Sequence, residues 1–275
     1  MNRLFVANKP ENISSNNFLR DIKRKYNVKK AGYSGTLDPF AEGVRIIAFG
    51  QYTKLFNYLK KSPKLYRAVL QLGAYSPTLD SEKIVRVEKI KRIDISILKD
   101  TINSLKGEVE YLPPKYSAKS IDGQRAYKLA REGKEFELKK IKSFIFDIKL
   151  LSYEHPFVSF EVSISEGGYV RSIANMISKS LQTTGALTKL QRLKEGEFVY
   201  NNEKELNPLE YIDTKPNEYL GNYDDITLGK KLDINLFKIK DDGKYHLRNG
   251  KYLTIIEIAN LKVSYKLNRI RMQGC

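Results

Sequence analysis

The pattern of hydrophobic and polar positions switches repeatedly along the chain between a period of two and a period of about 3.6 residues. Alternation, or a short apolar run between turn residues, predicts strands at residues 4–7, 44–49, 65–72, 144–150 and 158–164. Strands interspersed with helical stretches are typical of a mixed α/β chain. Because many of the strands follow one another in hairpin-like order, we expect a largely antiparallel sheet.

Two of these strands carry explicit predictions about their faces. Alternation over residues 65–72 places four side chains on one face, those of Tyr66, Ala68, Leu70 and Leu72. The larger side chains of residues 144–150 alternate with polar or smaller ones and are those of Phe144, Phe146, Ile148 and Leu150. His155-Pro156 is expected at the turn of a hairpin between the strands at 144–150 and 158–164.

A period of about 3.6 residues predicts helices beside this sheet. The first is capped by Ser14 or Ser15 and runs to about Tyr26, and another covers residues 95–105 behind an Asp94 cap. Further helices are expected at residues 53–60 and 170–181. The fold class predicted is therefore α/β (α+β), with a mixed, largely antiparallel sheet and flanking helices.

Two regions are expected to lie outside this main body, which we assign to residues 1–205. Residues 112–142 are long and polar and are predicted to form an insertion. After residue 201 the chain becomes rich in Asn and Asp, which predicts a linker at about 205–230. Short strands then follow near Leu236, Tyr245, 252–258 and 262–267, and predict a small β-rich C-terminal domain at 230–275.

Composition excludes several classes of protein. With 41% hydrophobic and 29% charged residues, the chain can build a large core and is not disordered as a whole. One cysteine, Cys275, and two histidines leave no disulfide framework or Cys/His zinc site, and we expect no metal. No apolar run reaches the roughly 18 residues of a membrane span, and the N-terminal apolar stretch is too short for a signal peptide. We therefore expect a cytoplasmic protein without a membrane partner.

Charge points to a polyanionic partner, because the formal net charge is +17. Basic residues gather in one-sided runs: residues 20–30 hold six with one acid, and residues 54–67 hold five with none. The chain also has 18 tyrosines, and aromatic faces are what splayed RNA bases stack on. Nucleic acid is thus the favoured partner, with an anionic membrane surface as the competitor.

Asp38 is the strongest candidate for a catalytic residue. It lies in the sequence GYSGTLDPFAEG, where Gly35 permits a tight turn and Pro39 biases Asp38 toward an extended backbone. A carboxylate held on such a loop beside basic runs can serve as a nucleophile or a base. The alternative is that Asp-Pro only starts a turn, and spacing alone favours that interpretation.

A resemblance changes this balance. Six segments resemble the TruB family in order over about residues 3–200: ANKPENISSN, KAGYSGTLDPFAEGVRIIAFG, KLYRAVLQLGAYSPTLDSE, PPKYSAKSIDGQRAYKLAREG, GGYVRSIANMI and GALTKLQRLKEGEF. This family makes pseudouridine at position 55 in the T-loop of transfer RNA. The resemblance implies the pseudouridine synthase fold and an isomerase that needs neither cofactor nor metal. It also implies that the T-arm is the partner and that uridine-55 is flipped out of its stack. Nothing in the sequence requires a dimer, and we expect a monomer.

The resemblance implies a catalytic trio. Asp38 matches the family's aspartate nucleophile, which acts on C6 of the uracil or C1′ of the ribose, or as a base at C2′. Arg171, in GGYVRS, is similar to the arginine that pairs with this aspartate, and its planar fork suits a bidentate bond. Tyr66, in KLYR, is similar to the tyrosine that stacks on the target uracil. The plainer alternatives are a core tyrosine and an ordinary residue in the first turn of a helix.

Five further positions are implied to bind or support the substrate. Tyr169 is similar to a second pocket aromatic, Leu190 and Arg192 match apolar and basic positions that line the site, and Lys9 matches a lysine that supports the catalytic loop. Tyr33 departs from the family, which usually has histidine there. Tyrosine can stack on a base but cannot carry a proton near neutral pH.

The resemblance also assigns the regions outside the main body. Residues 112–142 match an insertion that closes over RNA, and the family precedent for residues 230–275 is a small β-barrel of the PUA type. Three alternatives to a transfer RNA synthase remain: a non-catalytic RNA-binding or tRNA-folding protein on the same scaffold, a related synthase for ribosomal RNA, and a membrane-surface protein.

Overall fold

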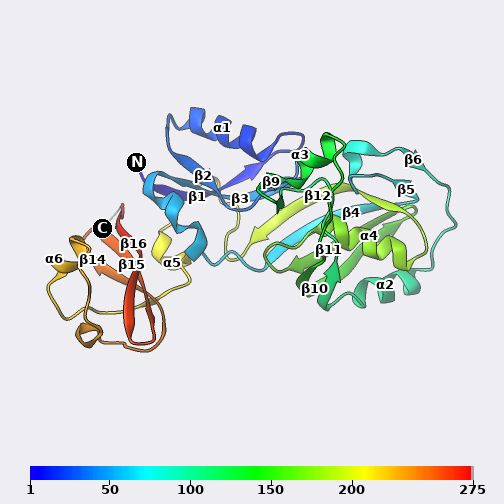
Figure 1. The fold of residues 1–275 in the computed structure, drawn as a ribbon. Helices are drawn as coiled ribbons and strands as arrows, with labels where there is room; N and C mark the ends of the chain where they lie inside the picture. The colour runs from blue at the N-terminus through cyan, green and yellow to red at the C-terminus, as the bar shows by residue number, and fades with distance from the viewer. Residues whose placement is uncertain (274–275) are drawn as a thin grey trace.

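The computed structural model describes residues 1–273, so Cys275, for which we expect neither a disulfide nor a catalytic role, lies outside them. A large body holds the main sheet, and a smaller unit of C-terminal strands lies beside the end that carries the N-terminus (Figure 1). Within the described residues, no helix is both long enough and apolar enough to cross a membrane.

The main sheet has eight strands in the order β1-β3-β12-β4-β11-β10-β7, with β2 paired to β3. Every pairing in it is antiparallel except a two-residue parallel contact between β12 and β3. The expected mixed, largely antiparallel sheet is thus confirmed. The strands are β1 (Arg3–Lys9), β2 (Ala31–Tyr33), β3 (Glu42–Phe49), β4 (Lys64–Leu72), β7 (Gly107–Tyr111), β10 (Ile141–Glu154), β11 (Phe157–Ile164) and β12 (Gly185–Glu195).

Helices α1 (Ser15–Lys25), α2 (Ile95–Asn103) and α4 (Val170–Ser180) flank this sheet. The expected caps are confirmed: Asn17 N–H donates to Ser14 Oγ at 3.1 Å, and Ser96 N–H donates to Asp94 Oδ1 at 2.7 Å. Helices α2 and α4 share one hydrophobic core with β4 and β11. The shorter elements of the body are η1 (Gly50–Tyr58), β5 (Ala74–Tyr75), η2 (Ser81–Lys83), β6 (Arg86–Val87), β8 (Ser120–Ile121), β9 (Gln124–Arg125) and α3 (Ala126–Arg131).

Strand β4 lies at the centre of the sheet and follows its predicted alternation. Tyr66, Ala68, Leu70 and Leu72 are all buried, while the residues between them are half-buried or exposed. Strand β10 does not. Phe144 and Phe146 are 47% and 45% exposed, whereas Ile145 is fully buried. A register shift between Ile145 and Asp147 inserts an extra residue and returns Ile148 to the core, so simple alternation gave the wrong face for both phenylalanines.

Two further expectations need correction. Residues 53–60 lie mostly in η1, a 3-10 helix rather than an α-helix, in which the buried Tyr52 and Leu55 are three residues apart as that geometry requires. Leu236 lies in the 3-10 turn η3 (Ile234–Leu236) and not in a strand. Asn235 N–H donates to Asp233 Oδ1 at 2.9 Å, which caps that turn.

The C-terminal unit is a four-stranded sheet in the order β13-β14-β15-β16. The strands predicted near Tyr245, at 252–258 and at 262–267 are confirmed, and the PUA-type assignment stays a prediction. The expected linker at 205–230 holds short elements rather than bare chain. The elements are α5 (Pro208–Tyr211), β13 (Lys215–Pro216), α6 (Tyr223–Thr227), β14 (Gly243–Asn249), β15 (Tyr252–Ala259) and β16 (Lys262–Arg271).

The small sheet is joined to the main body by a shared core. Leu253, Ile255 and Ile270 pack in one cluster with Leu4 of β1 and Ile46 of β3. Each of these side chains is fully buried. A shared apolar cluster couples the unfolding of the two parts.

Ile255→Ala is therefore expected to lower the free energy of unfolding of the whole chain by about 2–5 kcal/mol, the usual cost of truncating a buried isoleucine. Urea unfolding followed by far-UV circular dichroism measures this. We expect one transition, shifted to lower urea, and little change for the exposed control Ile97→Ala. Two separate transitions, with only one shifted, would contradict the coupling.

Candidate active site

The loop between β2 and β3 carries Asp38 and is held from several sides. Gly35 has a φ of +48°, and a side chain there would meet the Lys64 ammonium, so this turn favours glycine. Ser15 Oγ donates to the Leu37 carbonyl at 2.7 Å and accepts from the Leu37 N–H at 3.2 Å. Lys9 Nζ donates to the Pro39 carbonyl at 3.1 Å. These contacts on both sides of Asp38 fix its backbone.

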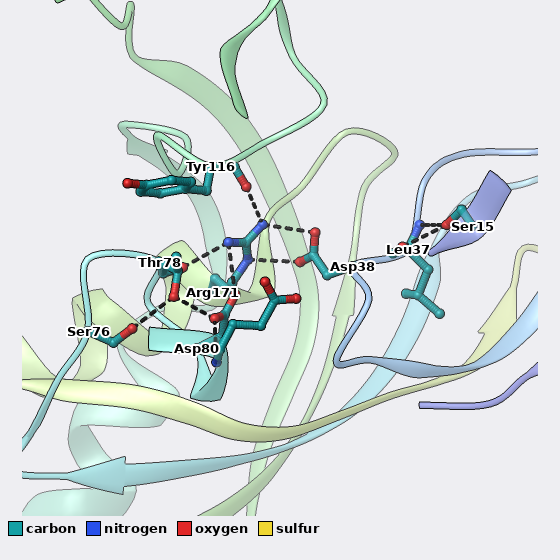
Figure 2. A network of polar contacts seen from close by, with 9 residues as sticks. Ser15, Leu37, Asp38, Ser76, Thr78, Asp80, Tyr116 and Arg171 are labelled. Atoms are coloured by element: carbon teal, nitrogen blue, oxygen red, sulfur yellow. Dashed lines mark hydrogen bonds and ion pairs between the residues drawn. The ribbon is translucent and has the colours of Figure 1, made fainter. Parts of the chain in front are cut away.

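Arg171, in the first turn of α4, binds the Asp38 carboxylate through two of its nitrogens (Figure 2). Nε lies 2.8 Å from Oδ2, and Nη2 lies 2.9 Å from Oδ1. Arg171 is 3% exposed, while the Asp38 side chain is 29% exposed. A bidentate pair of this kind fixes the direction of the carboxylate. One face of Asp38 stays open to a reactant.

The far side of the Arg171 guanidinium is bound by the segment before η2 (Figure 2). Nη1 donates to the Thr78 carbonyl at 2.8 Å and to Asp80 Oδ2 at 3.1 Å. Asp80 is buried and also accepts hydrogen bonds from Thr78 Oγ1 at 2.6 Å and from the Glu82 N–H at 3.1 Å. Burial raises the pKa of Asp80, and the Arg171 charge opposes that rise. Asp80 thus orients the arginine that orients Asp38.

A cavity of about 260 Å³ opens beside this pair. Such a volume is near the lower end for small-molecule sites, which span roughly 300–1,000 Å³, and suits one flat ring. Five of the predicted site residues line it together: Asp38, Tyr66, Tyr169, Arg171 and Leu190. Lys64, Lys119 and Gly167 are among the other residues that line it.

Comparison with known proteins matches the family described as "TruB family pseudouridylate synthase (N terminal domain)" over residues 23–170. The chain is 48% identical over 270 residues to a tRNA pseudouridine synthase B of Campylobacter jejuni (strain RM1221), covering 98% of this chain and 99% of that protein. It is 52% identical over 271 residues to the protein of the same name from Sulfurimonas denitrificans, with 98% and 99% covered. The chain belongs to the TruB family. It is therefore an isomerase.

The fold of this TruB protein is similar to that of solved structures at 15–17% sequence identity. A crystal structure of a Cbf5-Nop10-Gar1 complex aligns with a TM-score of 0.66 at 17% identity, over 98% of this chain and 84% of that chain. An archaeal box H/ACA sRNP Nop10-Cbf5 complex aligns with a TM-score of 0.66 at 15% identity, over 98% and 87%. The pseudouridine synthase fold expected from the resemblance is thus confirmed.

Three predicted site residues of this TruB chain do not line the cavity: Lys9, Tyr33 and Arg192. Lys9 lies beneath the loop that carries Asp38, where its Nζ binds the Pro39 carbonyl. Arg192 is buried in β12, where its Nε donates to the Val44 carbonyl at 2.7 Å. Burial acts to lower the pKa of Arg192, but Glu195 and Tyr66 outweigh it and raise that pKa. Arg192 is therefore a buried neighbour of Tyr66 and not part of the cavity wall.

Sequence reasoning missed two carboxylates of this TruB site. Asp80 lies in the segment TLDSE, which the resemblance covers, but no periodicity marks it as a partner of Arg171. Glu195 is fully buried, lies 3.2 Å from Lys64 Nζ and accepts a hydrogen bond from Ser34 Oγ at 2.8 Å. Lys64 lies in a basic run that we assigned to RNA, yet its ammonium forms a buried ion pair with Glu195. Among residues 1–273 no cluster of three or more potential metal-ligating His, Cys, Asp or Glu side chains occurs.

Lys9 gives a pH-dependent prediction. Burial, with help from Arg45, lowers the pKa of Lys9 to about 8. Between about pH 8 and pH 10 the unfolded chain holds a proton at Lys9 that the folded chain has released, so this group makes folding more favourable as pH rises. Urea unfolding at both pH values is expected to show wild type gaining stability relative to Lys9→Met. The exposed control Lys99→Met should show no such gain, and a constant difference for Lys9→Met would refute the lowered pKa.

Proposed function

We propose that the chain is a transfer RNA pseudouridine synthase that isomerises uridine-55 in the T-loop, with Asp38 as nucleophile and without a cofactor. The observation that carries this is the Asp38–Arg171 pair at the wall of a cavity sized for one base. Relatives at 48% and 52% identity, named tRNA pseudouridine synthase B, support the choice of transfer RNA.

The reaction breaks the N1–C1′ bond of uridine, turns the uracil and joins C5 to C1′. The C5 hydrogen leaves as a proton and N1 gains one, so the product is an isomer of the substrate. The Arg171 guanidinium, with Nε 2.8 Å from Asp38 Oδ2, holds the carboxylate in place for the first step. Three first steps are open to the carboxylate: attack on C6, attack on C1′, or removal of a proton at C2′.

A uridine in a folded T-loop is stacked, so the enzyme must flip it out to reach its glycosidic bond. Tyr66 and Leu190 line the cavity and offer a flat and an apolar surface to the flipped uracil. Stacking on an aromatic ring contributes about 1–3 kcal/mol per base, which helps offset the cost of unstacking. Tyr169 lines the same cavity, and burial raises the pKa of its phenol, which favours the neutral form.

The T-arm is bound by the basic side chains of the protein surface and by the insertion at 112–142. This insertion reaches the site: the Tyr116 carbonyl accepts from Arg171 Nη2 at 3.0 Å, and Ala118 and Lys119 line the cavity. RNA that orders the insertion therefore also completes the environment of Arg171. The enzyme is proposed to act as a monomer in the cytoplasm.

Tritium release from transfer RNA transcripts labelled with [5-³H]uridine tests this function, because C5 loses its hydrogen only when the base is rejoined through carbon. We expect release of one tritium equivalent per transcript. A matched transcript with cytidine in place of uridine-55 should release none. Release from both transcripts would move the target to another uridine. No release, with the RNA still bound, would favour the non-catalytic RNA-binding protein.

A further inference from the structure

Arg45, in β3, is a buried cation that the reaction described above does not use. It is fully buried, and none of the ion pairs among residues 1–273 joins it to a carboxylate within 4.0 Å. Its guanidinium donates instead to Ser15 Oγ, to the Gly35 carbonyl, and to the Ser34 carbonyl at 3.4 Å. Burial, with the nearby Arg192 charge, lowers the pKa of Arg45 to about 9, so it remains charged at neutral pH.

The flat face of this guanidinium supports Tyr33. The central carbon of Arg45 lies 3.8 Å from the centroid of the Tyr33 ring, a close cation–π contact. The Tyr33 hydroxyl also donates to Asn16 Oδ1, in the first turn of α1, at 2.7 Å. The ring is thus fixed from beneath and at its tip, while Tyr33 remains partly exposed.

The same guanidinium is tied to the catalytic loop on both sides of its turn. It binds the Ser34 and Gly35 carbonyls before the turn, and Ser15 Oγ, which it also binds, holds both main-chain groups of Leu37 next to Asp38. Arg45 is therefore a single group that contacts the Tyr33 ring and the frame of Asp38.

A cation in this place is costly. Removing a guanidinium from water without a carboxylate partner carries a large desolvation penalty, and an apolar side chain would fill the same space at lower cost. Packing alone therefore does not account for an arginine here. The contacts to the ring and to the loop offset its burial, together with the charge of Glu195.

We propose that Arg45 is a positioning residue that sets the Tyr33 ring relative to Asp38, so that an RNA base stacked on Tyr33 places the target uridine at the carboxylate. The proposal rests on the proposed function of the Asp38 site. It also gives Tyr33, which stands where TruB proteins usually have histidine, a role that needs stacking but no proton transfer.

The test is a double-mutant cycle on tritium release, measured at several transfer RNA concentrations. Tyr33→Leu removes the ring, and Arg45→Lys keeps the charge but removes the planar surface beneath it. Each is expected to raise KM about fivefold with kcat little changed, within the range of cation–π and stacking contributions. The double variant should raise KM no further than either single change, because both changes remove the same stacking surface, the Tyr33 ring supported by Arg45. Tyr33→Phe keeps the ring but loses the bond to Asn16, and should raise KM less than Tyr33→Leu does. The matched control is Tyr75→Leu, which removes an exposed ring that faces Arg86 outside the cavity and should leave KM at the wild-type value.

Two results would show that Arg45 stabilises the fold and does not position the Tyr33 ring. One is that the rises in KM of the single variants add in the double variant. The other is that Arg45→Lys leaves KM unchanged and lowers only the urea midpoint. If the Arg45→Lys variant does not fold, Arg45→Gln takes its place in the cycle. The planar amide of glutamine can donate to the same carbonyls but carries no charge. Failure of the underlying function has a different signature, because wild type itself would then release no tritium.

Discussion

Asp38→Asn is expected to lower kcat for tritium release by on the order of 10⁴-fold or more, the size of loss that follows removal of a nucleophile. That factor corresponds to roughly 5.5 kcal/mol of transition-state stabilisation. The amide has nearly the same shape and its oxygen can still accept a bond from Arg171, so the fold and the affinity for transfer RNA are expected to persist. A filter-binding titration and single-turnover tritium release measure the two quantities separately.

The matched control is Asp100→Asn on α2, where the carboxylate is exposed and the site distant, and its turnover should equal that of wild type. Substantial turnover by Asp38→Asn would remove the aspartate from the mechanism. Loss of RNA binding together with turnover would instead assign Asp38 to holding the loop.

Arg171→Met is expected to abolish turnover and to lower the free energy of unfolding by about 3–5 kcal/mol, the cost of leaving a buried charge without its partner. Two carboxylates share this arginine, and Asp80 is the more deeply buried of them. The stability loss should therefore come mainly from Asp80. Adding Asp80→Asn to Arg171→Met removes that stranded charge and should recover part of the stability without restoring activity.

Urea unfolding and tritium release on the single and double variants measure this separation. The exposed control Arg20→Met should change stability by no more than about 0.5 kcal/mol. If the double variant is less stable than Arg171→Met alone, Asp80 stabilises the fold through Thr78 and Glu82 more than through the arginine.

The sequence predicted those parts of the molecule that depend on local pattern or on motif. The alternation around Leu70, the Ser14 and Asp94 caps and the sheet class are all confirmed. The bulge in β10 was missed because an inserted residue changes the face of Phe144 and Phe146 without breaking the apparent alternation. Only the paired strand reveals it.

The sequence also did not predict which charged residues around the site are buried. Asp80, Glu195 and Arg45 each look like ordinary surface residues in the sequence, and each is buried because a partner distant in sequence comes to meet it. Ser34 and Glu195, for example, are 161 residues apart. Hydrophobic periodicity carries no information about such pairings, whereas motif order gave Asp38 and Arg171 because both lie in recognisable segments.

The cluster that joins the small sheet to the main body also has a consequence for synthesis. Leu4 leaves the ribosome 266 residues before Ile270, which packs in the same cluster. At about 5–20 residues per second, the intervening chain takes roughly 13–50 s to make. Through that time the apolar faces of β1 and β3 lack their final cover. The nascent enzyme therefore has one open core while the chain between these two residues is made, and heat stress during this interval is expected to promote its aggregation.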